Sequence, residues 1–222
     1  MLGQSITRNS LLLALFAVFT TLLIAGTFLS TKDTIAAEKR RAEEKALLEI
    51  VPRATHDNSM LDDTIAVGPG AAGLGLTEEK NIYIARNNGR AIAAILPVTA
   101  PDGYTGDIEL IVGVKADGSV AGVRTLVHRE TPGLGDKVDL KKSDWILSFN
   151  GRSLENPTLS GWAVTKDKGV FDQFTGATIT PRAVVAAVSR ALQYAQANQE
   201  QLFPVANEIS ENDEVASKRG TP

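Results

Sequence analysis

Cysteine is absent from this sequence of 222 residues. Without it the chain cannot form disulfides, bind iron–sulfur clusters through thiolates, use a thiolate nucleophile or attach haem through a Cys-x-x-Cys-His motif. Histidine is nearly absent too, because only His56 and His128 occur, and no pattern typical of a metal site is found. Any redox carrier in this protein is therefore expected to be organic, and no metal is predicted.

A strong charge of either sign is also missing. The formal net charge is −3, and no run of five or more lysines and arginines occurs. Nucleic-acid binding requires a clustered basic surface, so no nucleic-acid partner is expected. Apolar residues make up 43% of the chain, which permits a packed core in one domain of ordinary size.

Charged residues are absent from Leu11 to Leu29, a run of 19 residues whose polar side chains are three threonines. At about 1.5 Å per residue, a helix of this length nearly spans a hydrocarbon core of about 30 Å. A cleaved signal peptide is the closest alternative, but its apolar region is usually only about 7–15 residues long, and no clear cleavage site follows Leu29. The run predicts an uncleaved transmembrane anchor at 10–30, so the membrane is an expected partner.

The basic residues around this span give a weak signal for its orientation. Arg8 alone precedes the span, whereas Lys32 and a cluster at 39–41 follow it. Counting lysine and arginine alone favours a cytoplasmic position for the residues after the span. The cluster is set back from the span and mixed with glutamates, however, so this count decides little.

The chain after the anchor predicts an α+β fold of antiparallel hairpins with flanking helices. Three hairpins are expected, each from two apolar segments joined by a turn: 81–86 with 90–98, 107–115 with 120–128, and 161–166 with 170–174. A short helix is predicted at 143–149, and a longer one opens at Thr180-Pro181, where threonine can cap and proline suits the first helical position.

The expected division of the chain follows from these elements. Helix formers are abundant at 31–52, which indicates a helix ending before Pro52, and His56 to Thr77 is rich in glycine, which is typical of a loop. We therefore predict an N-terminal segment at 1–9, the anchor at 10–30, a juxtamembrane helix at 31–52, a linker at 53–80, the folded domain at 81–203 and a mobile polar tail at 204–222.

The first segment with chemical potential is Asp172–Pro181 (DQFTGATITP). Gly176 and Ala177 permit close approach of another molecule to the backbone. The helix that follows directs free N–H groups and a partial positive charge toward this spot, which favours a phosphate that Thr178 could hydrogen-bond or esterify. By its physics alone, however, the segment is more simply explained as an ordinary turn before a capped helix.

The second segment is 128–137 (HRETPGLGDK), which follows a predicted strand. Its two glycines permit tight backbone geometry, so the loop can place main-chain groups and Leu134 against a planar ligand. A long connection with ordinary turn chemistry explains the same residues equally well. His128 is better explained as a strand-end residue than as an acid, base or ligand, because it has no partner histidine nearby.

Together with the anchor, these segments resemble one family closely. The chain is similar to the G subunits of the Rnf (Rsx) ion-translocating electron-transport complex and, more distantly, to the C subunits of the sodium-translocating NADH:quinone reductase. The match runs from the anchor to about residue 195 and rests on APDGYTGDIELIVG at 100–113, HRETPGLGDK at 128–137, SDW at 143–145, WAV at 162–164 and FDQFTGATITPRAVV at 171–185.

The resemblance implies a covalent FMN, joined through its phosphate to the threonine that ends the [ST]-G-A-T unit, here Thr178. It also implies a separate flavin transferase that reads Asp172 through Thr178, a segment that includes Thr175, Gly176 and Ala177. The loop at 130–135 matches a family segment that packs near the flavin. Its expected flavin neighbours are Glu130, Thr131, Gly133 and Leu134.

The resemblance further implies a bacterial inner-membrane protein with one span and a periplasmic C-terminal domain, against the weak charge count. Its expected partners are the other subunits of an Rnf-type complex, and its expected function is electron relay within an oxidoreductase that translocates ions. A membrane-tethered periplasmic binding or scaffolding module without a redox cofactor is the alternative. An independent flavin-dependent reductase of a small molecule is a third hypothesis.

The two tryptophans and one glycine-rich stretch have simpler structural explanations. Trp145 and Trp162 could stack on a flavin, yet a tryptophan is more often part of the core. The stretch Gly68–Gly75 lacks the lysine of a phosphate-binding P-loop and follows no predicted strand, so it is assigned no nucleotide role.

Overall fold

The computed structural model describes residues 2–204. The chain divides into two compact units, Met1–Lys45 and Ala46–Pro222, which are described separately. The predicted polar tail begins at residue 204, and residues 205–222 lie outside the described part of the chain.

The N-terminal unit is helical. It is formed by the part of α1 (Leu2–Ile50) that ends at Lys45 and contains one stretch long and apolar enough to cross a membrane. No part of that stretch is buried. The threonines of the span are accommodated because Thr20 and Thr27 donate hydrogen bonds to the carbonyls of Phe16 and Leu23, at 3.0 and 2.8 Å. The anchor and the juxtamembrane helix were predicted as separate segments, whereas one continuous helix carries both and ends before Pro52 as expected.

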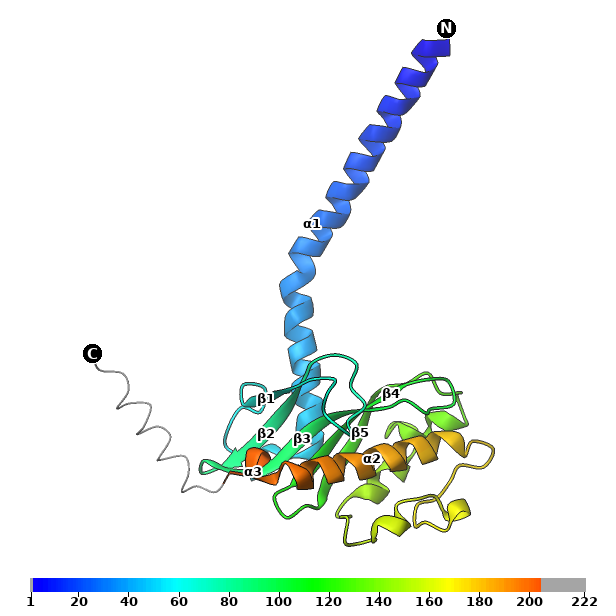
Figure 1. Cartoon of the computed structure of the whole chain (residues 1–222). Coiled ribbons are helices and arrows are strands. Elements are labelled where there is room, and N and C mark those ends of the chain that lie inside the picture. Colours follow the sequence, from blue (N-terminus) through cyan, green and yellow to red (C-terminus); the bar gives the residue numbers. More distant parts are fainter. Residues whose placement is uncertain (1, 205–222) are drawn as a thin grey trace, which may run out of the picture. The chain divides into compact units, whose positions relative to one another are not determined.

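The second unit is built on a five-stranded antiparallel sheet in the order β1-β2-β3-β4-β5 (Figure 1). Two of the predicted hairpins are confirmed. Asn88 and Gly89, with φ of 49° and 76°, form the turn of the first, and Gly118, with φ of 81°, lies in the turn of the second. The strands are β1 (Thr64–Val67), β2 (Lys80–Asn87), β3 (Arg90–Ala100), β4 (Ile108–Lys115) and β5 (Val120–Val127).

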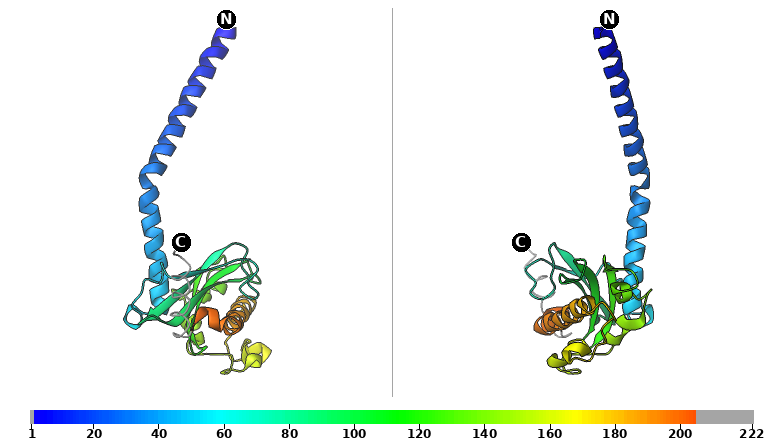
Figure 2. Two further views of the ribbon diagram at one scale, coloured as in Figure 1. Left: turned by 60° about the vertical axis from the view of Figure 1, so that its left-hand side comes forward. Right: turned by 90° about the vertical axis from the view of Figure 1, so that its right-hand side faces the viewer.

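The two faces of the sheet are covered by different helices. Figure 2 shows α2 (Ile179–Ala197, orange) on one face and the C-terminal end of α1 (cyan) on the other. The α2 face holds the larger core, because the apolar stripe of the helix packs on β3 and β4. On the opposite face, Leu47, Ile50 and Val51 pack on Ile95 and other buried residues of the strands.

The third predicted hairpin is wrong. Residues 159–174 contain two short 3-10 helices, η4 (Leu159–Gly161) and η5 (Thr165–Asp167), and a parallel bridge between Val164 and Phe171. The N–H groups of Lys168 and Gly169 donate back to the carbonyls of Thr165 and Val164, at 3.0 Å each. These local hydrogen bonds occupy backbone N–H and C=O groups that would otherwise pair across the two strands of a hairpin.

The linker expected at 53–80 also needs correction, because it contains β1. The prediction of a loop over His56–Thr77 fails there because two polar side chains fasten the segment to β2. Asn58 Nδ2 donates to the carbonyl of Ile84 at 2.9 Å. Arg86 Nε donates to Asp63 Oδ2 at 2.7 Å. The described connections also contain η1 (Arg53–Thr55), η2 (Gly135–Val138), η3 (Asp144–Phe149, the predicted short helix) and α3 (Gln199–Leu202).

Candidate functional site

A pocket of about 330 Å³ lies where three loops converge near the start of α2. The loops are the connection before β4, the loop after β5 and the turn before α2. The lining residues are Tyr104, Glu130, Thr131, Leu134, Gly135, Gly176, Ala177, Thr178, Ile179 and Thr180. Both segments that the sequence singled out, 128–137 and 172–181, therefore contribute to one cavity.

The turn before α2 is closed by a hydrogen bond of 3.1 Å from the N–H of Ala177 to the carbonyl of Phe174. Its third residue is Gly176, whose φ of 80° is a conformation that a side chain disfavours. Thr178 then occupies the N-cap position of α2, with φ of −78° and ψ of −26°. Its half-buried side chain makes no capping hydrogen bond, so the hydroxyl is free to meet a ligand in the pocket.

The helix begins earlier than expected. Thr180 was predicted to cap it, but α2 starts at Ile179 and Thr180 lies within its first turn. The Thr180 side chain is fully buried, and its hydroxyl donates a hydrogen bond to Glu130 Oε2. Thr180 was predicted as a cap because its contact with Glu130 joins residues 50 positions apart, and no local sequence pattern indicates it.

The loop after β5 is shaped by its own backbone. The carbonyl of Thr131 accepts hydrogen bonds from the N–H groups of Leu134 and Gly135, both at 3.1 Å, and Gly133 has a φ of 76°. This tight turn places Leu134, which is 42% exposed, beside Gly176, so the two loops touch. The Nδ1 atom of His128 accepts from the N–H of Glu130 at 3.2 Å, a contact that fits a strand-end role.

Six of the nine predicted site residues line the pocket: Glu130, Thr131, Leu134, Gly176, Ala177 and Thr178. The other three do not. Gly133 has the positive φ that its loop requires, while Asp172 and Thr175 are exposed in the segment that precedes Thr178. The prediction of site residues did not include Tyr104, Gly135, Ile179 and Thr180. All four lie in motifs of the resemblance, but none had been assigned a role in ligand binding.

Trp162 belongs to the core, and Trp145 is partly buried against it. Trp162 is buried and stacks with Phe149 at 6.1 Å between ring centroids. Trp145 packs edge-on against Phe149 and Phe174, and its Nε1 donates to the carbonyl of Asp172 at 2.8 Å. Neither lines the pocket, so Trp145 acts on the site by holding the chain that enters the turn.

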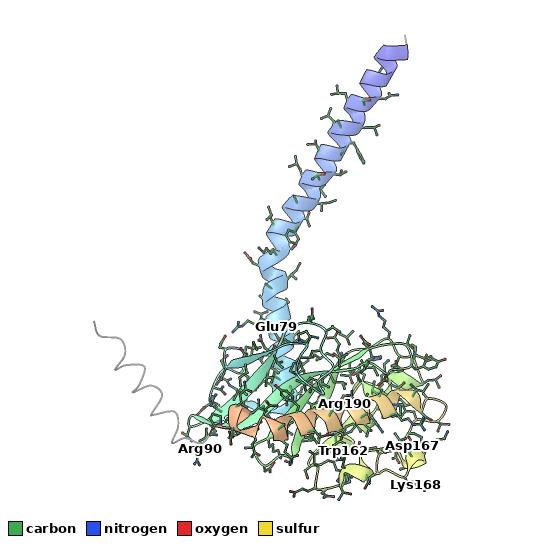
Figure 3. The ribbon with its side chains drawn as sticks, viewed as in Figure 1. Glu79, Arg90, Trp162, Asp167, Lys168 and Arg190 are labelled. Atoms are coloured by element: carbon green, nitrogen blue, oxygen red, sulfur yellow. The ribbon has the colours of Figure 1, made fainter. Side chains whose placement is uncertain are left out.

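An ion pair lies beside the first turn of α2. Arg182 donates to both carboxylate oxygens of Asp167, with Nη2 at 2.7 Å from Oδ1. These hydrogen bonds lower the pKa of Asp167 below its usual value and raise the pKa of Arg182. Figure 3 shows Asp167 and Lys168 on the loop beside the N-terminal end of α2, away from Arg190, which lies farther along the helix.

The chemistry of the pocket fits a ligand that combines a phosphate with a planar apolar group. Tyr104, Leu134 and Ile179 are large side chains that remain 68%, 42% and 46% exposed at its rim, where apolar area is available for contact. The N-terminus of α2, a helix of 19 residues, presents free N–H groups and the positive end of its dipole next to Thr178. FMN meets both requirements.

Comparison with known families gives two matches. The model of the FMN-binding domain matches residues 103–193, which include all pocket residues. The model of the RnfG N-terminal region matches residues 1–50, which include all of α1.

Comparison with individual proteins gives matches over nearly the whole chain. The G subunit of the ion-translocating oxidoreductase complex from Pseudoalteromonas atlantica is 49% identical over 205 residues, covering 92% of this chain and 95% of the relative. The corresponding protein from Pseudomonas aeruginosa, which carries the same name, is 49% identical over 200 residues, covering 90% and 93%. Among solved structures, Shewanella oneidensis NqrC is similar with a TM-score of 0.46 and 22% identity, covering 66% of this chain and 74% of that one.

Proposed function

Because the chain belongs to the family of G subunits of ion-translocating oxidoreductase complexes, we propose that it relays electrons through an FMN bound covalently to Thr178. The observation that carries this proposal is the position of Thr178, which lines the pocket at the start of α2 and whose side chain makes no capping hydrogen bond. When bound, FMN supplies one- and two-electron chemistry and can link carriers of different types.

The chain's own residues would hold and shield the cofactor. The first turn of α2 stabilises the single negative charge that a phosphodiester on Thr178 retains. Leu134 and Ile179 offer apolar contact, and Glu130, only 4% exposed, closes the cavity with the buried Thr180. No residue of the chain has to act as an acid, base or nucleophile on a substrate, since the proposed function is transfer of electrons.

Attachment requires a separate flavin transferase that uses FAD. The Thr178 oxygen forms a bond to the flavin-side phosphorus of FAD, the pyrophosphate bond breaks, AMP leaves and the hydroxyl proton is released. Asp172 and Thr175 do not line the pocket, but both are exposed beside it. An enzyme that reads Asp172 through Thr178 could therefore contact them from outside.

The proposed setting is the bacterial inner membrane, with the domain on the periplasmic side and the other subunits of the complex as partners. The anchor supports this setting, because tethering a carrier to the membrane raises its effective concentration near membrane partners. Covalent attachment suits a compartment in which lost FMN would not be replaced.

The covalent cofactor is testable on the whole chain. Protein co-expressed with a flavin transferase is expected to give a fluorescent band after denaturing electrophoresis and a mass increase equal to FMN minus one water. Protein made without the transferase serves as the control and should be dark. A dark band and unmodified mass in the presence of an active transferase would contradict the proposal and favour a binding or scaffolding module without a cofactor.

The orientation is testable because the natural chain has no cysteine. We expect a membrane-impermeant maleimide to label Ser148→Cys in intact spheroplasts, because Ser148 is exposed in the domain that we place in the periplasm. Asn9→Cys, in the N-terminal segment on the other side of the span, should be labelled only after the membrane is opened. The reverse pattern would place the domain in the cytoplasm, as the charge count favours.

A further inference from the structure

Glu130 is a buried acid on which three segments converge. Its side chain is 4% exposed, and both carboxylate oxygens accept hydrogen bonds. The N–H of Thr105, in the loop before β4, donates to Oε1 at 3.0 Å, and the hydroxyl of Thr180, in the first turn of α2, donates to Oε2. One side chain thus fastens the start of α2 to a loop that lies far from it in sequence.

The backbone of two glycines, Gly103 and Gly135, approaches the carboxylate of Glu130 closely. A Cβ atom added to Gly135 would lie 2.8 Å from both Glu130 Oε2 and Thr180 Oγ1, and one added to Gly103 would lie 3.0 Å from Glu130 Oε1. The distances at Gly135 are too short for a real side chain, and a Cβ atom at Gly103 would also lie 2.2 Å from the carbonyl oxygen of Gly106. Glycine at both positions therefore allows the two loops to close over the contact. The packed surroundings therefore hold the hydrogen bond between Glu130 and Thr180 in one arrangement.

The three threonines of the turn differ sharply in what their hydroxyls can do. Thr175 is exposed and does not line the pocket. Thr180 is fully buried, and its hydroxyl is already engaged with Glu130. Thr178 alone is half-buried, lines the pocket and makes no capping hydrogen bond.

We propose that Glu130 is the positioning residue for cofactor attachment. By holding the hydroxyl of Thr180, it fixes the first turn of α2 so that Thr178, two positions earlier, presents its oxygen to the pocket. This inference rests on the proposed attachment of FMN to Thr178, and it assigns to Glu130 the role of orienting Thr178 for that attachment. The bond-forming step is the one given above, with FAD as donor and AMP as leaving group.

The variants separate positioning from burial. Glu130→Ala removes both hydrogen bonds, and Thr180→Val removes the hydroxyl while keeping a similar shape. Glu130→Gln is the conservative variant, because its amide oxygen can accept from the N–H of Thr105 and its NH₂ group can donate to Thr180 Oγ1. Met60→Ala is the matched control, since it removes a buried side chain in the core on the opposite face of the sheet.

The experiment measures the initial rate of FMN incorporation into the full-length chain in detergent, with purified flavin transferase and varied FAD. Glu130→Ala and Thr180→Val are each expected to lower the maximal rate about tenfold, and the double variant should be no slower than the slower single variant. The KM for FAD should not change, because FAD binds the transferase. Glu130→Gln and Met60→Ala should stay close to the natural chain.

Several results would overturn the inference. Incorporation at the natural rate in folded Glu130→Ala would do so, as would a loss in Glu130→Gln as large as in Glu130→Ala. An equal loss in Met60→Ala would show that general stability controls attachment. If Glu130→Ala fails to fold, the rate of FMN incorporation into Thr180→Val tests the inference, and a natural rate in that variant would overturn it. A natural chain that takes up no FMN would defeat the proposed function itself, which distinguishes that failure from a failure of positioning alone.

Discussion

Replacement of Thr178 by alanine is expected to eliminate covalent flavin from the chain, because it removes the oxygen that bridges to the phosphate. The fold should be nearly unaffected, with a change in the free energy of unfolding within about 0.5 kcal/mol, since the side chain is half-buried and makes no capping hydrogen bond. Fluorescence of the denatured band and intact mass after co-expression with the transferase measure the effect.

Thr178→Ser is the matched control for this experiment. Serine keeps a hydroxyl at the same place, so flavin should still be found on the chain, and peptide mapping should locate it at position 178. A fluorescent band that persists in Thr178→Ala would contradict the assignment. Peptide mapping would then identify whether Thr175 or Thr180 carries the cofactor.

Replacement of Phe149 by alanine is expected to lower the free energy of unfolding by about 3–5 kcal/mol, as for other buried phenylalanines. The Phe149 side chain is fully buried at the centre of an aromatic cluster. Its ring centroid lies 4.6 Å from that of Phe171 and 5.3 Å from that of Trp145. Each such pair contributes roughly 0.5–1.5 kcal/mol beyond the burial of area.

Chemical denaturation of the full chain in detergent measures this effect. Leu159→Ala is a suitable control, because Leu159 is 59% exposed and its truncation should change stability by no more than about 0.5 kcal/mol. A loss below about 1 kcal/mol in Phe149→Ala would show that the cluster does not organise the domain. The expected loss of about 3–5 kcal/mol should also disturb the candidate site. Trp145 packs on Phe149 and donates a hydrogen bond to the carbonyl of Asp172, directly before the turn.

The parts of the fold that the sequence predicted are those with strong local signals. The first two hairpins combine apolar strands with turns that contain Asn88-Gly89 and Gly118, where positive φ is needed. The strand β1 was missed because it has four residues, alternates in exposure and lies at the edge of the sheet, where few apolar residues are required. Its place is set by pairing with β2 and by the hydrogen bond between Arg86 and Asp63, directly before the strand, which local patterns do not reveal.

The site was predictable to a similar degree. Motifs identified Thr178, Gly176 and the loop that begins at Glu130, and the structure brings them into one cavity. The partner of Glu130 was not predictable, because a threonine near the start of a helix is typically a cap. Its burial and its hydrogen bond arise only when segments fifty positions apart pack together. Such long-range contacts decide which hydroxyl remains free.

The end of α1 sets where the domain can be separated from its membrane anchor. Pro52, two residues beyond this helix, marks the obvious place to cut, but a chain that starts there lacks Leu47, Ile50 and Val51. Those side chains shield Ile95 and Ile111 from water. A water-soluble version of the domain must therefore begin no later than Ala46, the first residue of the second unit. A shorter version would expose an apolar face of the sheet and self-associate.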